Sequence, residues 1–355
     1  MAKVYTEPKS RYQIKDTVKN INSKRLIKHL RLFVRCCAPN RMVGGPGHKK
    51  VVPFLKEYIN DLDKDGSGKL SVDEYQADIN KAVKLYETDF AQEISSKYKK
   101  TDPVYIKWRK FTDSMTGEIK ARKNVKGRNV IWEKVGSKKP NDILVIGAHF
   151  DTIANDPETL VLKPEAKMPG ADDNGSGVAI ALSMIEVFSK LNLPITVRIV
   201  FFDWEELGFL GSYAYVQKYK DEFKKKNFLG YVNLEMLGHD SKVTDKTKKY
   251  RNMRVYTRPD RGDRILASKI TEAANMQATG VKFSIVENSF NSSDHINFWE
   301  EGFPAITFSQ DWENDFNKKR YHSSNDFVET INFSTFYKSY QYITGGILGY
   351  LFDAK

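Results

Sequence analysis

Histidine and carboxylate residues recur in five separate segments of this chain, each at or near the end of an apolar run. The segments are "GAHFDT" with His149 and Asp151, "PGADDNGSG" with Asp172 and Asp173, "FFDWEELG" with Asp203, Glu205 and Glu206, "VNLEMLGHD" with Glu235, and "RYHSSND" with Tyr321, His322 and Asp326. Carboxylates gathered in one place repel one another unless cations neutralise them. Imidazoles mixed with carboxylates form the ligand set of zinc or a similar divalent ion, rather than of calcium or magnesium alone.

Each of these residues also has a structural explanation. An aspartate in a glycine-rich turn, such as Asp172 or Asp173, often caps a helix. A single histidine is more often a hydrogen-bonded structural residue than a metal ligand. The joint pattern outweighs these explanations, because strand topology would bring the ends of such runs to one rim.

A second metal-binding pattern, "DKDGSGKLSVDE", covers residues 63–74 and fits a twelve-residue EF-hand loop. Gly68 supplies the sharp turn at position 6, and helical patterns flank the loop on both sides. The expected calcium ligands are the side chains of Asp63, Asp65 and Ser67, the carbonyl of Lys69, Ser71 through a water, and the bidentate carboxylate of Glu74. No second loop of this pattern occurs in the sequence, which disfavours a calcium sensor because EF-hands usually pair.

Strand-like and helical runs alternate from residue 129 onwards. This alternation predicts an α/β fold with a mostly parallel central sheet flanked by helices. Ligand sites in such sheets lie outside the carboxyl ends of the strands. Most of the histidines and acids in the five segments stand at such ends. The expected strands are residues 129–135, 142–151, 195–203, 229–237, 253–258, 283–287 and 304–309, and the expected helices are residues 176–191, 211–223, 264–276 and 333–352.

The amino-terminal part has a different organisation. Residues 1–20 are polar and lack periodicity, so we expect a loose arm. Apolar residues recur at helical spacing over residues 21–35 and again over residues 49–61, on either side of the glycine-rich "RMVGGPGH". The EF-hand pattern predicts a helical insertion over residues 55–100, within one domain that spans residues 21–355.

Composition narrows the class of protein. A chain of 355 residues that is 40% hydrophobic can form one large domain or two medium ones. It has no long apolar run, and its first residues are polar and charged, so we expect neither a membrane span nor a secretory signal. Cys36 and Cys37 are its only cysteines and are expected to be ordinary buried thiols. The net charge of +12 comes from dispersed lysines without a recognition motif, so no nucleic-acid partner is expected.

Six motifs of this chain resemble, in order and spacing, those of the co-catalytic di-zinc aminopeptidases. They are "GAHFDT", "PGADDNGSG", "FFDWEELGFLGS", "VNLEMLG", "SDHINFWEEGFPAI" and "YHSSNDF". The similarity runs from about residue 41 to the C-terminus, apart from one insertion. The resemblance implies a zinc-dependent exopeptidase that removes N-terminal residues from peptides and holds two zinc ions. The EF-hand pattern adds one calcium ion, with a structural or regulatory role. The resemblance also implies a location outside the cytoplasm, extracellular or periplasmic.

The resemblance implies a ligand role for five of these residues. The zinc ligands would be His149 and Glu235 for one ion, Glu206 and His322 for the other, and Asp173 as the bridge between them. The family usually has aspartate where this chain has Glu235. Glutamate binds zinc competently, but its extra methylene shifts the metal or the backbone, and Asp240 is the alternative ligand.

The resemblance also implies roles in catalysis. Glu205 would be the general base that takes a proton from the activated water and returns it to the leaving amine. Asp151 would fix the tautomer of His149, and Tyr321 would donate a hydrogen bond to the oxyanion. Asp203 is expected to be a structural acid.

Three alternatives compete with the aminopeptidase. Glutaminyl cyclases form a divergent branch of the family with one zinc ion. They commonly carry an insertion at the position of "EELGFLGS", which is compact in this chain, and "GAHFDT" with His149 is intact here. Both features disfavour the cyclase. Carboxypeptidase or dipeptidase specificity on the same scaffold stays open. A non-catalytic calcium-binding module would have lost ligands or the base, whereas all of those positions hold competent residues.

Overall fold

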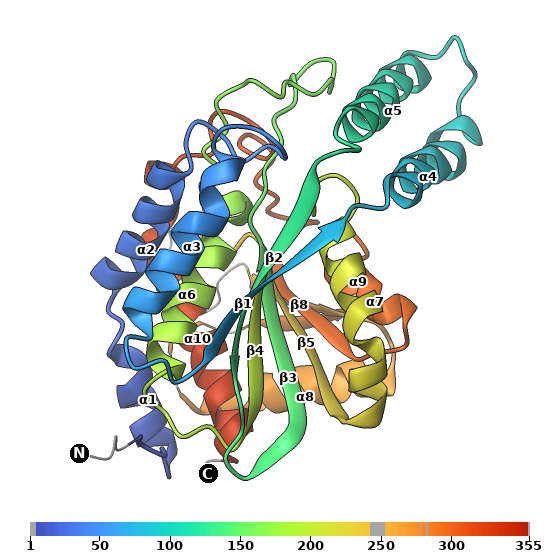
Figure 1. Ribbon diagram of the computed structural model, residues 1–355. Coiled ribbons are helices and arrows are strands. Elements are labelled where there is room, and N and C mark those ends of the chain that lie inside the picture. The colour runs from blue at the N-terminus through green and yellow to red at the C-terminus, as the bar shows by residue number, and fades with distance from the viewer. Residues whose placement is uncertain (1–4, 242–252, 278, 282, 354–355) are drawn as a thin grey trace.

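The computed structural model describes residues 5–241, 253–277, 279–281 and 283–353, and it has one mixed eight-stranded sheet flanked by helices (Figure 1). The strands are β1 (Lys69–Gln76), β2 (Lys126–Lys134), β3 (Lys139–His149), β4 (Ile195–Phe202), β5 (Asn227–Leu234), β6 (Met253–Thr257), β7 (Ser284–Glu287) and β8 (Ala305–Gln310). Their order across the sheet is β1-β2-β4-β3-β5-β8-β6-β7. The α/β fold class predicted from the sequence is therefore confirmed.

Helices cover both faces of this sheet. The helices are α1 (Arg11–Lys19), α2 (Ser23–Cys36), α3 (His48–Leu62), α4 (Ile79–Asp89), α5 (Pro103–Ala121), α6 (Gly177–Phe188), α7 (Leu210–Lys225), α8 (Arg261–Met276), α9 (His295–Glu300) and α10 (Phe333–Phe352), with short turns η1 (Phe90–Ser95), η2 (Ala171–Ser176) and η4 (Val328–Thr330). One apolar core joins the sheet to α2, α3, α6, α8 and α10, and a second joins it to α7 and α9 (Figure 1). No helix within the described ranges is both long and apolar enough to cross a membrane.

The central strands all end at one rim. Strand β3 pairs in parallel with β4 and β5, and β5 pairs in parallel with β8. Every residue of β4 is buried, as expected for a strand covered on both faces. Because these strands run the same way, the segments that follow β3, β4, β5 and β8 lie side by side.

The amino-terminal arm is more ordered than its sequence predicts. Residues 11–19 form α1, which begins after a Ser10 cap and buries Ile14 and Val18. The carbonyl of Val18 accepts a hydrogen bond from the Tyr340 hydroxyl on α10. The expected loose arm is therefore wrong for these residues, because two apolar side chains four apart are enough to seat a helix on an existing apolar surface. Residues 1–4 of that arm lie outside the described residues.

The EF-hand architecture predicted for residues 63–74 is wrong. Helix α3 leads into the loop as expected, but the segment that leaves it is β1, which pairs antiparallel with β2. Glu74 lies five residues past Lys69 along this strand, about 16 Å at about 3.3 Å per residue. Its Oε1 accepts a hydrogen bond from Lys126 Nζ at 2.6 Å. Glu74 is therefore held away from the loop and cannot serve as its twelfth-position ligand.

The first loop acid already has partners in the protein. The Asp63 carboxylate accepts hydrogen bonds from the backbone N–H groups of Ser67 and Gly68 and from the indole of Trp132 on β2. These bonds close the turn and attach it to the sheet. Calcium binding by Asp63, Asp65, Ser67 and Lys69 stays a prediction.

A helical hairpin, residues 77–125, projects from the rim at the edge of the sheet (Figure 1). It consists mainly of α4 and α5 and connects β1 to β2. Strand β2 runs antiparallel to β4, so the hairpin leaves and rejoins the sheet at the rim where β4 ends. Helix α5 was not assigned from the sequence, although it has an Asp102 cap followed by Pro103 at its first turn.

Asp63 and Glu74 should differ sharply in their contribution to stability. We expect Asp63→Ala to lower the free energy of unfolding by about 2–3 kcal/mol, because the buried Trp132 indole and two partly buried backbone N–H groups lose their acceptor. We expect Glu74→Ala to cost less, because its ion pair with Lys126 is solvent-exposed. Urea unfolding of both variants and the parent chain measures the difference. Equal losses would contradict the placement of Glu74 on an exposed strand face.

Candidate metal centre

The rim gathers the histidine and acid residues that the sequence singled out. They are His149 at the end of β3, Glu205 and Glu206 in the turn after β4, Glu235 directly after β5, Asp173 in η2 at the start of α6, and His322 in the loop after β8. All of them are buried except His322, which is partly buried. The prediction that these segments converge is therefore confirmed.

Two groups of three ligand atoms share one carboxylate. His149, Asp173 and Glu235 form one trio, and Asp173, Glu206 and His322 form the other. His149 Nε2 lies 3.4 Å from both Asp173 Oδ1 and Glu235 Oε1. His322 Nε2 lies 3.3 Å from Asp173 Oδ2 and 2.9 Å from Glu206 Oε2. Each oxygen of Asp173 thus faces a different imidazole, which is the arrangement of a bridging ligand.

These separations suit zinc. A tetrahedral zinc ion with ligand bonds of about 2.1 Å holds its ligand atoms about 3.4 Å apart. The buried atoms Asp173 Oδ2 and Glu206 Oε1 also have no hydrogen-bond partner. Burying polar atoms without partners is costly, so both trios fit a pair of zinc ions. His149, Glu205 and Glu206 also form a possible trio.

The cluster favours positive charge at both imidazoles. Burial opposes protonation of His149, but nearby carboxylates led by Glu205 outweigh it and raise the pKa of this imidazole well above its usual value. Burial opposes protonation of His322 as well, yet Glu206 and Asp173 raise its pKa to about 10. An electrostatic field that holds protons on two buried imidazoles also attracts cations.

The acids of the cluster resist joint ionisation. Burial raises the pKa of Glu205 well above its usual value. The charge of His149 opposes this increase, and the charge of Glu206 adds to it. Burial and the charge of Asp173 raise the pKa of Glu206 to about 7. The pKa of Asp173 itself is lowered, because the bonds and charges of His149 and His322 outweigh its burial. Cations between these groups would let all three acids ionise together.

Asp151 mainly positions the turn that carries the two glutamates. Its Oδ1 accepts a hydrogen bond from Glu205 N at 3.0 Å, and its Oδ2 accepts one from Glu206 N at 3.1 Å. The predicted contact with His149 is present, but Nδ1 lies 3.6 Å from Asp151 Oδ1, longer than a hydrogen bond. The side chain is fully buried, so it fixes the turn from within.

Asp203 and Asp240 lie outside the metal trios. Asp203 Oδ1 lies 2.7 Å from His48 Nε2, and its Oδ2 accepts a hydrogen bond from the backbone of Arg128. His48 on α3 is thus the partner that the sequence could not supply for this structural acid. Asp240 Oδ2 accepts a hydrogen bond from the Thr335 hydroxyl, and Asp240 belongs to neither trio.

Tyr321 lies against the cluster within a wall of aromatic rings. Its ring stacks on His322 with centroids 3.6 Å apart, and Trp312 and Phe316 pack against its other edges. Burial and the carboxylates led by Asp173 raise the pKa of Tyr321 well above its usual value. The hydroxyl therefore stays protonated and can donate a hydrogen bond.

Asp326, which the sequence singled out without a role, supports the site by accepting hydrogen bonds from the backbone N–H groups of Asp172 and Asp173. Two other supporting residues were missed from the sequence. The Ser293 hydroxyl donates a hydrogen bond to Glu235 Oε2 at 2.8 Å. Buried Arg41 donates to three backbone carbonyls, including that of Gly170. The motif "SDHINFW" contains the serine, but no sequence pattern links Arg41 to this loop.

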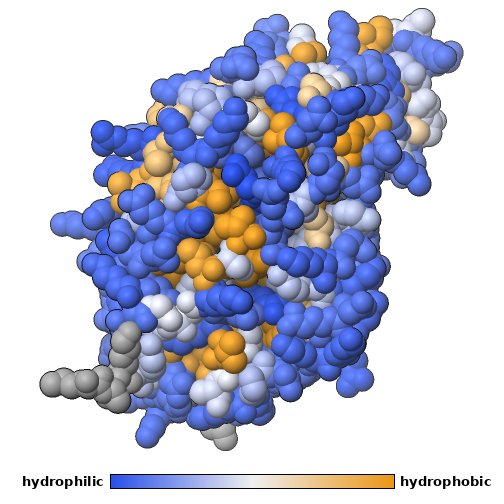
Figure 2. All heavy atoms as spheres, viewed as in Figure 1, coloured by the Kyte–Doolittle hydropathy of each residue, from blue (hydrophilic) through white to orange (hydrophobic). Residues whose placement is uncertain are grey.

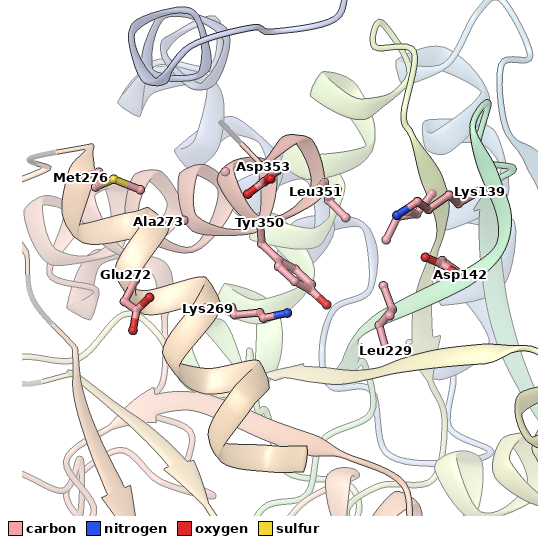
Figure 3. A pocket seen from close by; sticks show the side chains of 12 residues that line it. Lys139, Asp142, Leu229, Lys269, Glu272, Ala273, Met276, Tyr350, Leu351 and Asp353 are labelled. Carbon is pink, nitrogen blue, oxygen red and sulfur yellow. The ribbon is translucent and has the colours of Figure 1, made fainter. Parts of the chain in front are cut away.

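A cavity of about 480 Å³ lies away from this cluster (Figure 3). It is lined by Lys139 and Asp142 of β3 and by residues of α8 and α10, including Lys269 and Tyr350. Lys139 begins β3 whereas His149 ends it, so the cavity is at the opposite end of the strands from the metal trios. Its lining carries charges of both signs and no histidine.

The sequence of this chain is similar to those of known peptidases. Residues 129–345, more than half of the chain, match Peptidase family M28. Aminopeptidase YwaD of Bacillus subtilis is 29% identical over 224 residues, which cover 61% of this chain and 43% of that protein. A probable zinc metalloprotease of Pyrenophora tritici-repentis is 27% identical over 210 residues, which cover 52% of this chain and 42% of that protein. The chain thus spans less than half the length of these curated relatives.

Solved structures resemble the whole fold. The LapA aminopeptidase of Legionella pneumophila superimposes with a TM-score of 0.66 at 17% identity, covering 100% of this chain and 78% of that one. A glutaminyl cyclase of Fimbriiglobus ruber gives a TM-score of 0.63 at 18% identity, and the match covers 94% of this chain and 96% of that one. At these identities the likeness concerns the fold alone.

The shared carboxylate predicts an unequal effect of ligand substitutions on zinc content. We expect two zinc ions per parent chain, about one in His322→Ala, and none held tightly in Asp173→Ala, because both trios lose a ligand there. Asp240→Ala is the control and should keep two. Elemental analysis of dialysed protein measures the content, with circular dichroism to check folding. Two tightly held ions in Asp173→Ala would contradict the bridging role.

Proposed function

The chain belongs to Peptidase family M28, and from this premise we propose that it is a zinc-dependent aminopeptidase acting on peptides. The observation that carries the proposal is the pair of buried trios that share Asp173. Hydrolysis of an amide needs an activated water, a base for its proton and donors for the oxyanion. The rim holds candidates for each of these tasks.

Five side chains would hold the metal ions. His149 and Glu235 would hold one zinc ion, Glu206 and His322 would hold the other, and Asp173 would offer one carboxylate oxygen to each. Bound zinc would supply a lowered pKa for water and polarisation of the substrate carbonyl. A glutamate at position 235 is compatible with this set, because Ser293 holds one of its oxygens while Oε1 faces His149.

Glu205 is the general base of the proposal. It belongs to neither of the trios that share Asp173, and its Oε2 lies 3.8 Å from His149 Nε2. Asp151 accepts hydrogen bonds from the backbone N–H groups of Glu205 and Glu206, which fixes where the two adjacent side chains leave the turn. Glu205 would take a proton from water at Oε2 and return it to the leaving amine.

Tyr321 is the oxyanion donor of the proposal. Its hydroxyl is protonated because burial raises its pKa, and its ring is fixed by stacking on His322. A donor that is already oriented can stabilise charge that develops on the carbonyl oxygen without reorganisation. The residue therefore acts without changing its own protonation.

A glutaminyl cyclase is the second candidate, supported by the solved cyclase of similar fold. Cyclases of this family use one zinc ion, whereas both trios are complete here and His149 is present. The turn after Glu206 is also short, because α7 begins at Leu210. These observations favour hydrolysis. Carboxypeptidase or dipeptidase specificity and a location outside the cytoplasm stay predictions.

Replacing the base should separate catalysis from metal binding. We expect Glu205→Gln to lower kcat by a factor of about 10²–10⁴, the contribution of general acid–base catalysis, with zinc content unchanged. Release of leucine from Leu-Ala-Ala measures kcat, and elemental analysis measures zinc. Parental activity in the zinc-loaded variant would overturn the role of Glu205.

The reaction products should separate the two candidate functions. We expect free leucine from Leu-Ala-Ala and free glutamine from Gln-Ala-Ala, with no cleavage of acetyl-Leu-Ala-Ala because its amine is blocked. Mass spectrometry of the zinc-loaded protein's products tests this. A pyroglutamyl peptide from Gln-Ala-Ala without any release of leucine would favour the cyclase instead.

A further inference from the structure

The helical hairpin, residues 77–125, is attached directly to the turn that carries the catalytic glutamates. The hydroxyl of Tyr86 on α4 donates a hydrogen bond to the backbone carbonyl of Glu206 at 3.0 Å. Closer to the sheet, the Tyr75 hydroxyl donates to the carbonyl of Asp203 at 3.1 Å. Ala82 packs so closely on Gly208 that a Cβ on this glycine would lie 2.9 Å from the alanine Cβ. The hairpin is therefore a wall of the metal centre.

This wall carries an apolar groove between its two helices, with a volume of about 170 Å³. Its lining is mostly aromatic or aliphatic: Tyr86, Asp89, Phe90, Ile94, Trp108, Phe111 and Thr112. The Phe111 ring lies edge-on to both Trp108 and Tyr86, at centroid distances of 5.4 and 6.3 Å. Trp108 is 39% exposed, and apolar side chains are visible on the hairpin at the upper right of Figure 2. We call this site the hairpin groove.

The Tyr86 side chain connects the hairpin groove to the metal-ligand turn. Its ring lines the groove, and its hydroxyl bonds to the carbonyl of Glu206, so the length of one tyrosine side chain separates the two. An extended peptide covers that distance in about two residues. A peptide whose first amide lies at the metal trios and whose chain leaves along the hairpin would thus bring its second or third side chain to the groove.

A second set of aromatic rings lies against the metal centre. Trp312 packs against Tyr321, Phe290 and Phe316; Phe290 lies in the loop after β7, and the other three rings lie in the loop after β8. The hairpin, by contrast, lies outside residues 129–345, the part of the chain that matches the family. The two walls therefore offer separate apolar contacts to a bound peptide.

We propose that the hairpin groove is a subsite for a large apolar side chain at the second or third residue of the peptide substrate, beyond the bond that is cleaved. This inference rests on the proposed aminopeptidase function. The groove's volume of about 170 Å³ suits one aromatic or aliphatic side chain, and its mostly apolar lining offers that side chain contacts away from water. The subsite makes the hairpin a determinant of which peptides this chain binds.

Kinetic discrimination tests the subsite in the full zinc-loaded chain. The substrates are Leu-Phe-Ala, Leu-Ala-Phe and Leu-Ala-Ala, which share their first residue. We expect kcat/KM for one of the phenylalanine peptides to exceed that for Leu-Ala-Ala by about tenfold or more, given the value of burying an aromatic ring. Trp108→Ala should reduce this ratio about fivefold, and Ile94→Trp, which fills the groove, should reduce it as well.

Ile106→Ala is the matched control. Ile106 is 44% exposed on the same helix, but it lies about 200° around α5 from Trp108 and does not line the groove. Its ratio should equal that of the parent chain. An unchanged ratio in both Trp108→Ala and Ile94→Trp, or no phenylalanine preference in the parent chain, would overturn the subsite. Light scattering measures the mass of the Trp108→Ala variant in solution. If that mass differs from the parent's while the ratio of kcat/KM values does not change, the groove serves self-association instead.

A binding measurement separates the failure of the subsite from the failure of the proposed function. Glu205→Gln, loaded with zinc, is titrated calorimetrically with the same three peptides. We expect one phenylalanine peptide to bind about tenfold more tightly than Leu-Ala-Ala, and the gap to shrink when Trp108→Ala is added. Absence of hydrolysis by the parent chain would refute the aminopeptidase alone, whereas equal binding of all three peptides would refute the subsite.

Discussion

The carboxylate of Asp173 is the point on which the rest of the site depends. Each of its oxygens faces a different imidazole, 3.3–3.4 Å away, and each imidazole faces a further glutamate. Four ionisable groups are thereby gathered around Asp173, where like charges repel strongly unless cations lie between them. The parallel strands β4, β3, β5 and β8 make this concentration of charge possible, because their carboxyl ends meet at one rim.

Other buried acids stabilise the backbone that presents these ligands. Asp151 holds the N–H groups of the two glutamates, and Asp326 holds those of Asp172 and Asp173. Each carboxyl group accepts hydrogen bonds from two successive backbone N–H groups at once, so it fixes a turn that has no regular hydrogen-bond ladder of its own. The ligand side chains are thus positioned through their own backbones.

The hairpin, which lies outside the part of the chain that matches the family, is also held in place by backbone contacts at the site. Its root is joined to the same turn by the hydroxyls of Tyr75 and Tyr86, so its position is fixed relative to the metal trios. An insertion at the edge of the sheet can change the surroundings of a catalytic centre without disturbing its ligands, because β1 and β2 add to the sheet without altering the parallel strands. The site and its specificity can therefore vary independently.

The sequence by itself determined the parallel strands and the residue types at their ends. Buried strands need continuous apolar runs, and a histidine or an acid directly at the end of such a run, such as His149 or Glu235, is visible in the sequence alone. It could not distinguish a strand from the end of an EF-hand over residues 69–76, since Val72 and Glu74 satisfy both patterns. Nor could it pair Asp203 with His48, or bring Trp108 and Phe90 together into a groove. Those outcomes depend on contacts between segments far apart in the chain, which only the tertiary structure decides.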